Sequence, residues 1–242
     1  MSSRPKQKRV LSLRDLIAGY NQLPVISIKN LEICSGDVVA LVGESGAGKS
    51  TLFAAIGGAI NPISGTLLIE DKVQSPEWRR LNISRTLQAF PLLHWLTVGE
   101  NLTLAAKTKG VTLPAPSSIL AHVRAEHLEG KYVNSLSGGE RCRASIAQAI
   151  VANPVVLLLD EPFNGLDGRV KREVADSVFK FARRRESAVL FASHDIGDAM
   201  AYSNRVIVLK TGAPTTIGME VASGEFGSLE KIYSFLEEDG DI

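Results

Sequence analysis

A glycine-rich segment with the order Gly-Glu-Ser-Gly-Ala-Gly-Lys-Ser is the part of this sequence best suited to binding phosphate. Its glycines let backbone N–H groups turn inward around the β- and γ-phosphates of a nucleotide, its lysine adds a positive charge, and its last serine offers Mg²⁺ a hydroxyl. The alternative without function is a glycine-rich turn in which the lysine occurs by chance. The predicted nucleotide-binding residues are Gly43, Glu44, Ser45, Gly46, Ala47, Gly48, Lys49, Ser50 and Thr51.

Two neighbouring carboxylates, Asp160 and Glu161, follow the apolar run of residues 155–159. If that run is a strand of a parallel sheet, both carboxylates lie at the sheet edge where the phosphate loop also lies. Asp160 would then hold Mg²⁺ through its water shell, and Glu161 would polarise the water that attacks the γ-phosphate in line. Without the phosphate loop, a solvated turn would explain the pair equally well.

A second anion-binding segment precedes a helix expected at about residues 141–150. It offers a hydroxyl, flexible backbone N–H groups and the positive end of a helix dipole. Taken alone, the segment would be explained better as a helix cap. Its residues are Leu136, Ser137, Gly138, Gly139 and Glu140.

The surrounding pattern predicts an α/β sheet that positions these segments. Alternation over residues 10–33 indicates antiparallel strands, and the continuous apolar run of residues 38–42 indicates a strand buried on both faces. A helix should begin near Lys49. Strands are expected at 155–159, 188–192 and 206–209, with a helix at about 169–185 between the first two.

Residues 89–135 show the apolar spacing of helices instead of the continuous apolar runs of the strands, and they predict a small helical insert. Apolar residues recur at helical spacing after a cap at Ser117 or Ser118. A last amphipathic helix is predicted near the end of the chain. The apolar positions of these two helical segments are Ile119, Leu120, Val123 and Leu128, and then Leu229, Ile232, Tyr233 and Leu236.

The composition excludes several classes of function. The 242 residues carry a formal net charge of +1, which provides no general attraction to nucleic acid. No apolar run approaches the roughly 18 residues of a membrane-spanning helix. The basic residues 1–9 have no apolar signal core after them and predict a solvated tail, and the two cysteines fit no metal or redox spacing.

The order of the motifs resembles that of the ABC ATPases over nearly the whole chain. This resemblance implies four further roles. Tyr20 would stack on adenine, Gln88 would be the Q-loop residue that contacts the metal and senses the γ-phosphate, Asp167 would belong to the D-loop, and His194 would be the switch histidine at the γ-phosphate. Catalysis would then rest on Glu161, His194, Lys49 and Gln88, with Mg²⁺ held by Ser50, Gln88 and Asp160.

The resemblance also implies an architecture and partners. It predicts an α/β P-loop core sheet at 10–88 and 151–242 with an N-terminal antiparallel β subdomain, and a helical subdomain at 89–150 inserted between the Q-loop and the signature motif. ATP with Mg²⁺ would bind between two copies arranged head to tail, with residues 136–140 of one copy completing the site of the other. Separate transmembrane permease subunits, with a solute-binding protein as a further candidate, would place the chain on the cytoplasmic face of the membrane.

Some details depart from the family pattern or leave alternatives open. Asn164 and Gly165 replace the usual D-loop residues, and Glu140 stands in the signature motif where glutamine is more usual. In the helix that follows, Cys142 and Gln148 stand where glutamine and arginine are typical. The apolar stretch 90–96 could either form a groove for a membrane subunit or pack within the insert. Residues 91–101 and 194–199 resemble most the nitrate, sulfonate and taurine importer ATPases, while a lipid or peptide export ATPase is the alternative. DNA-repair members need a long coiled coil that is missing between Thr51 and Leu136, and ribosome-acting members carry two cassettes.

Overall fold

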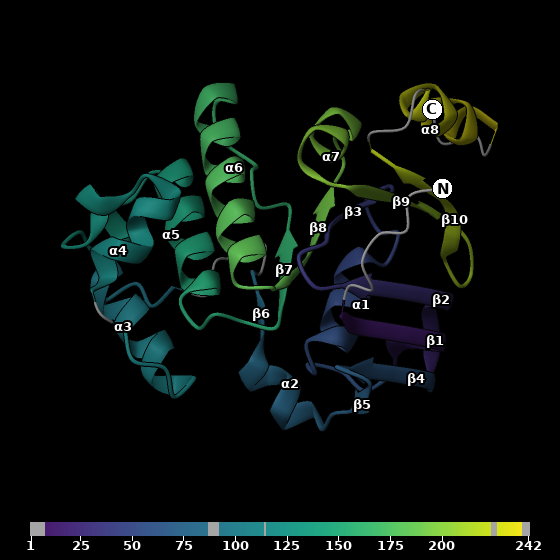
Figure 1. Cartoon of the computed structure of the whole chain (residues 1–242), viewed down its shortest axis with the longest axis horizontal. Helices are drawn as coiled ribbons and strands as arrows, with labels where there is room; N and C mark the ends of the chain where they lie inside the picture. Colours follow the sequence, from purple (N-terminus) through teal and green to yellow (C-terminus); the bar gives the residue numbers. More distant parts are fainter. Residues whose placement is uncertain (1–7, 87–91, 114, 224–226, 239–242) are drawn as a thin grey trace.

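The computed structural model describes residues 8–86, 92–113, 115–223 and 227–238 and contains a six-stranded sheet at its centre (Figure 1). Neighbouring strands pair in parallel, except that the edge strand β10 is antiparallel to β9. The carboxyl ends of five strands therefore meet at one edge of the sheet. In spatial order the strands are β10 (Thr216–Ala222), β9 (Arg205–Lys210), β3 (Val38–Val42), β8 (Ala188–Ser193), β7 (Val156–Asp160) and β6 (Ile83–Arg85).

A second, four-stranded sheet is antiparallel and corresponds to the predicted β subdomain. Its two long strands pair across a turn at Asn21 and Gln22, whose φ angles of 51° and 64° are the left-handed values that tight hairpins require. The sheet confirms the antiparallel strands expected from the alternation over residues 10–33. Its strands, in spatial order, are β2 (Leu23–Cys34), β1 (Arg9–Tyr20), β4 (Ser64–Ile69) and β5 (Lys72–Val73).

Helices cover both faces of the central sheet. Helix α1 (Lys49–Ile56) lies between the two sheets, while α5 (Gly138–Ile150) and α6 (Gly168–Arg184) lie on the opposite face (Figure 1). Alternate residues of β3 consequently face different cores: Val39 and Leu41 pack with α1 and the small sheet, and the other residues of β3 pack with α5 and α6. Burial on both faces explains why β3 is apolar throughout.

The helical subdomain differs in detail from the expected one. Helix α3 (Val98–Thr108) was not predicted, and α4 (Pro116–Leu120) begins after Ala115, so the expected cap at Ser117 or Ser118 is wrong. Pro116 suits a first helical position because it lacks an N–H that would have no partner there. Short 3₁₀ helices then replace a regular helix: η1 (Ala121–Val123), η2 (Glu126–Leu128) and η3 (Val133–Ser135).

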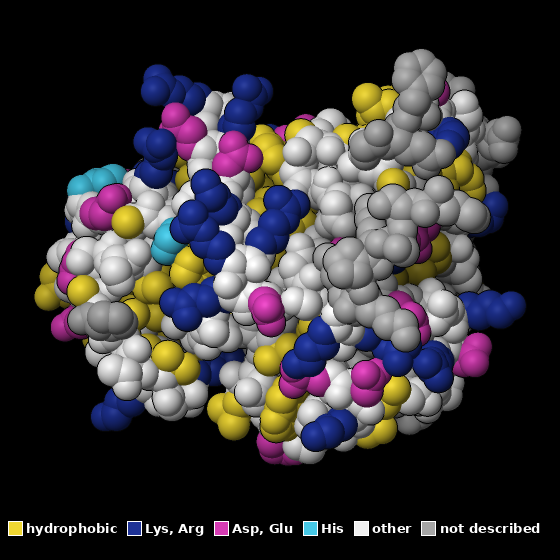
Figure 2. All heavy atoms as spheres, viewed as in Figure 1, with side chains coloured by type: hydrophobic (Ala, Val, Ile, Leu, Met, Phe, Trp, Pro, Cys, Tyr) yellow, Lys and Arg dark blue, Asp and Glu magenta, His cyan; other side chains and the backbone are white. Residues whose placement is uncertain are grey.

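The remaining helices complete the chain. Helix α2 (Pro76–Asn82) precedes β6, α7 (Ile196–Tyr202) follows β8, and α8 (Ser228–Glu238) packs on β10. In α8 the predicted apolar face is only partly buried, because Ile232 and Leu236 are covered whereas Leu229 and Tyr233 are exposed. None of the helices within the described residues has both the length and the hydropathy needed to cross a bilayer. Figure 2 shows Lys and Arg side chains gathered along α6, with Asp and Glu side chains among them.

Candidate functional site

The phosphate loop joins β3 to α1, at the carboxyl edge of the central sheet. Gly46 and Gly48 have φ angles of 90° and 77°, in the left-handed region that glycine adopts without strain. Gly48 also lacks space for a side chain, because a Cβ atom there would lie 3.2 Å from Val25 and 3.3 Å from Ile26. The β1–β2 hairpin therefore supports the loop from behind, and the loop closes around the start of α1.

Lys49 occupies the hollow of this loop. Its Nζ donates hydrogen bonds to the backbone oxygens of Gly43 and Glu44, the latter at 2.7 Å, and the residue is only 7% exposed. Burial lowers the pKa of Lys49, while the nearby Glu161, Asp160 and Glu44 oppose that shift. A partly desolvated ammonium attracts phosphate oxygens more strongly than one in water does, so phosphate can replace the two carbonyls as its partner.

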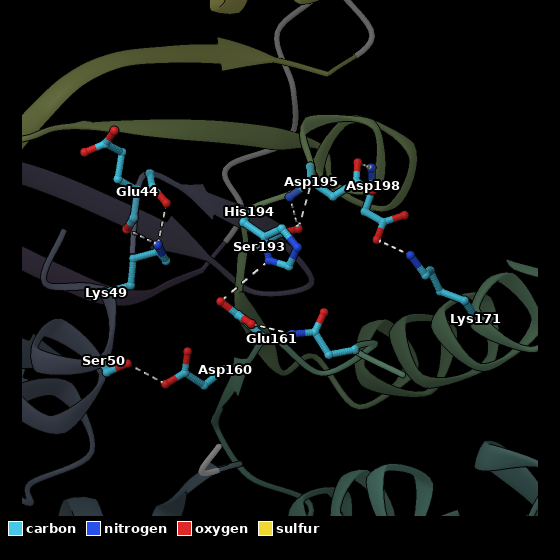
Figure 3. A network of polar contacts seen from close by, with 12 residues as sticks. Glu44, Lys49, Ser50, Asp160, Glu161, Lys171, Ser193, His194, Asp195 and Asp198 are labelled. Carbon is cyan, nitrogen blue, oxygen red and sulfur yellow. Dashed lines mark hydrogen bonds and ion pairs between the residues drawn. The ribbon is translucent and has the colours of Figure 1, made fainter. Parts of the chain in front are cut away.

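A hydroxyl and a carboxylate suited to Mg²⁺ come together between α1 and β7. Ser50 Oγ donates to Asp160 Oδ2 at 2.7 Å (Figure 3). No group of three or more His, Cys, Asp or Glu side chains that could hold a metal occurs within the described residues. This oxygen pair fits Mg²⁺, which prefers oxygen ligands and is usually held by one or two carboxylates together with substrate phosphates.

Asp160 is held in place from β6. Its backbone N–H donates to Thr86 Oγ1 at 2.9 Å, and the Thr86 N–H donates to the Leu158 oxygen at 2.9 Å. Both Thr86 and Asp160 are buried, with exposed fractions of 4% and 8%. The end of β7 is therefore fixed on its β6 side by a side chain as well as by the backbone.

Glu161 lies just beyond β7 in a conformation that is unusual for its residue type. Its φ angle is 47°, so its backbone is left-handed although it has a Cβ atom. Oε2 accepts a hydrogen bond from Asn164 Nδ2, and Oε1 lies 3.7 Å from His194 Nδ1 (Figure 3). The carboxylate thus points toward the end of β8 and lies beside the phosphate loop's functional groups.

His194 follows β8 and has a 63% exposed side chain. The turn that carries it is fixed on both sides: Ser193 Oγ accepts from the Asp195 N–H at 3.0 Å, and Asp195 caps α7 by accepting from the Asp198 N–H at 3.0 Å. Asp198 is paired in turn with Lys171 of α6 at 2.7 Å. An exposed imidazole on a fixed turn is available to a ligand at the sheet edge.

The signature segment begins α5 with a capping box. Ser137 Oγ accepts from the Glu140 N–H at 3.3 Å, and Glu140 Oε2 accepts from the Ser137 N–H at 2.9 Å. This cap starts the helix at Gly138, three residues before the expected Arg141. Leu136 is buried, whereas Ser137 and Gly138 are exposed.

Contacts between the signature segment and the D-loop occur within the same chain. A Cβ atom on Gly139 would lie 3.3 Å from the Gly165 oxygen and 3.4 Å from Leu166. Asp167 caps α6, since its Oδ1 accepts from the Val170 N–H at 3.1 Å. Among the described residues, the signature segment shares no hydrogen bond or ion pair with the phosphate loop.

Tyr20, and two positions that depart from the family pattern, lie outside the group of contacts described above. Tyr20 ends β1 with a 50% exposed side chain. Gln88 lies outside the described residues. Cys142 is buried, donates from Sγ to the Pro162 oxygen at 2.8 Å and has a pKa raised to about 11 by burial. Gln148 lines a groove beside α3.

Sequence reasoning missed two residues that hold this site together. Thr86 contacts Asp160, and Lys171 supports the His194 turn through Asp198. The only signal for Thr86 was its position, as a polar residue two places before Gln88. Lys171 lies among several basic residues of α6, and nothing local to it distinguishes the one that is paired.

The comparisons with known proteins agree with this geometry. The ABC transporter family model matches residues 27–164. The sulfate/thiosulfate import ATP-binding protein CysA 1 of Agrobacterium fabrum is 30% identical over 232 residues, which are 92% of this chain and 67% of that protein. The Fe(3+) ions import ATP-binding protein FbpC of Escherichia coli O157:H7 is 31% identical over 217 residues, 88% of this chain and 62% of that protein.

Solved structures lead to the same family. A dimeric bacterial ABC transporter cassette superposes with a TM-score of 0.76 at 26% identity, covering 89% of this chain and all of the other. The relatives named above are importer ATPases for sulfate, thiosulfate and Fe(3+), so similarity to the nitrate, sulfonate and taurine group in particular is not what the comparisons found. With a matching family model over more than half of its length and relatives at least 30% identical, the chain belongs to the ABC transporter family as an ATP-hydrolysing, ATP-binding subunit.

Proposed function

We propose that two copies of this chain close head to tail around ATP, so that the signature segment of one copy completes the phosphate loop of the other. One observation supports this proposal above all. Ser137 and Gly138 are exposed at the start of a capped helix, yet among the hydrogen bonds of the described residues none joins them to the phosphate loop of their own chain. A helix N-terminus attracts anions, and a phosphate bound to a second copy is an anion that can reach it.

The residues of the sheet edge divide the work of hydrolysis. Lys49 and the loop N–H groups hold the β- and γ-phosphates, and Ser50 with Asp160 would hold Mg²⁺, which neutralises charge on the phosphates when it is bound. Glu161 accepts a hydrogen bond from the attacking water and so directs its lone pair at the γ-phosphorus. His194 Nδ1 lies 3.7 Å from Glu161 Oε1 and would contact the γ-phosphate on the same side.

Replacing Glu161 with glutamine tests both the dimer and the base. Glu161→Gln should bind ATP, lose steady-state turnover and accumulate as an ATP-dependent dimer, measured by phosphate release and by sedimentation velocity. Lys49→Ala is the control, because it should lose nucleotide affinity and hence never dimerise. Undiminished hydrolysis by Glu161→Gln would refute its role as base, and a monomer in saturating ATP would refute the head-to-tail dimer.

The partner subunits in the membrane would dock in the groove beside α3, which has a volume of 490 Å³. Leu93, Leu104 and Ala149 provide apolar lining, and Arg80 and Lys109 provide cations. The described part of the stretch 90–96 supports both expectations for it. Leu92 is buried and packs within the insert, whereas Trp95 is 70% exposed and available to a membrane subunit. Such a groove suits a short amphipathic helix. Purification of the tagged chain from its native membrane, followed by identification of co-purifying integral membrane proteins, tests this docking.

For the transported solute we propose import of a small oxyanion, of the nitrate, sulfonate or taurine kind. The relatives named for sulfate and thiosulfate support oxyanion chemistry, and the relative named for Fe(3+) identifies the competing outcome. Uptake of labelled sulfate, taurine, nitrate and Fe³⁺ into vesicles holding the native complex would decide between them. ATP-dependent uptake of Fe³⁺ alone, or outward transport of lipid or peptide, would contradict the proposal.

A further inference from the structure

The signature segment of this chain carries a negative charge at a place where its function requires the opposite sign. In the proposed dimer, on which this inference rests, residues 137–139 approach the γ-phosphate of ATP bound by the other copy. Glu140 follows directly and is ionised. Like charges repel more strongly where water is excluded, so an uncompensated carboxylate here would weaken closure of the dimer.

The carboxylate of Glu140 is held beside the turn and stays ionised near neutral pH. Its Oε2 is held by the Ser137 N–H at 2.9 Å, which fixes the side chain beside the turn. The pKa of Glu140 is lowered to about 2, first by the Ser137 backbone N–H and next by Lys131. Protonation therefore does not remove the charge at the pH of ATP hydrolysis, and compensation requires a cation.

Lys131 is the cation in position to compensate. Its Nζ lies 2.9 Å from Glu140 Oε1, the oxygen that the capping box leaves free, whereas His127 Nε2 is 3.9 Å away. The backbone of Lys131 is fixed, because its N–H donates to the Leu128 oxygen at 2.9 Å and its own oxygen accepts from the Val98 N–H at 2.9 Å. These bonds fix the point from which the lysine side chain extends, and its contact with the signature segment is the ion pair with Glu140.

We propose that Lys131 is a positioning residue for the signature motif, which neutralises Glu140 so that the turn at residues 137–139 attracts the phosphate of the opposing ATP. The role is a consequence of having glutamate rather than the more usual glutamine at position 140. A glutamine would keep the capping box, since its amide oxygen also accepts from the Ser137 N–H, and would need no cation. The positive charge of Lys131 is therefore needed only because residue 140 is negatively charged.

The test is a double-mutant cycle in the hydrolysis-deficient Glu161→Gln background. The measured quantity is the MgATP concentration at which half of the chain sediments as a dimer. Lys131→Gln should raise it about tenfold, which corresponds to about 1.4 kcal/mol, and more at low salt than at high salt. The double variant Lys131→Gln with Glu140→Gln should match Glu140→Gln alone, because removing the lysine has no effect once the carboxylate is gone.

Controls separate charge from folding. Lys131→Arg keeps the cation and should match the parent, and Lys72→Gln removes an exposed lysine of β5. Thermal unfolding of these two controls should match that of the parent, and every variant should unfold in one cooperative transition. ATP binding to the monomer, measured with a fluorescent nucleotide, should be the same for Lys131→Gln as for the parent. A tenfold defect that persists in the Glu140→Gln background would overturn the proposal, and so would a Lys131→Gln variant that dimerises like its parent. If the parent itself forms no ATP-dependent dimer, the proposed function fails together with this inference.

Discussion

Replacing Thr86 with valine removes one hydroxyl from beneath the catalytic edge and should destabilise the whole domain. Thr86 Oγ1 is the acceptor for the Asp160 N–H, and both residues are buried. Valine has nearly the shape of threonine, so packing is retained while the N–H at the end of β7 loses its partner. The change therefore isolates a single buried hydrogen bond.

The expected magnitude follows from the burial of the donor. Leaving a buried N–H without an acceptor costs roughly 1–3 kcal/mol. For a domain of this size, each kcal/mol lowers Tm by about 2–4 °C. With a central cost of about 2 kcal/mol, Thr86→Val should lower Tm by about 6 °C. Turnover should also fall, because Asp160 is the carboxylate that Ser50 contacts at 2.7 Å.

The assay compares Tm by calorimetry for the parent, Thr86→Val and Thr86→Ser. Serine keeps the hydroxyl and loses only a methyl group, a change worth about 0.8 kcal/mol, so it should lie between the other two. A valine variant as stable as the parent, or less damaging than the serine variant, would refute the claim that this hydroxyl satisfies the Asp160 N–H.

Two further predictions concern the loop and the signature. Gly48→Ala and Gly36→Ala both force a Cβ onto a left-handed backbone, with φ of 77° and 74°, and each should cost about 1 kcal/mol. Only Gly48 is crowded by Val25 and lies in the loop, so only its variant should lose MgATP affinity in a titration; equal affinity would contradict the assigned geometry. Because folding lowers the pKa of Glu140 from 4.5 to about 2, its ionised form contributes stability above pH 4.5 that is lost as the pH falls toward 2. Urea unfolding should find the wild type more stable than Glu140→Gln by about 1 kcal/mol near pH 6, a figure reduced for solvent screening, and no more stable near pH 2; a difference independent of pH would count against this.

The strands that carry catalytic residues could be predicted from the sequence because burial on both faces makes them apolar throughout. Strand β7, for example, has five buried residues in succession before Glu161. The three-residue strand β6 has no such signal, since Ile83–Arg85 becomes a strand only through pairing with β7. Short elements at a sheet edge are decided by their neighbours rather than by their own residues.

Within the site, motif residues could be predicted and their supporting partners could not. Lys49 and Asp160 belong to segments whose order is informative by itself. Lys131 and Asn164 act through contacts with Glu140 and Glu161, and each partner choice depends on the path of the folded backbone. The helical insert was predicted least well, because its apolar residues are buried by short 3₁₀ turns, whose spacing imitates that of an α-helix over a few residues.

The left-handed backbone of Glu161 has a consequence for protein engineering. A residue with a Cβ atom at a φ of 47° gives up about 1 kcal/mol of folding free energy. Glycine would recover much of that energy but would supply no base. Selection of this chain for heat resistance alone would thus favour loss of the carboxylate, and directed evolution of thermostable variants needs a parallel selection for ATP turnover.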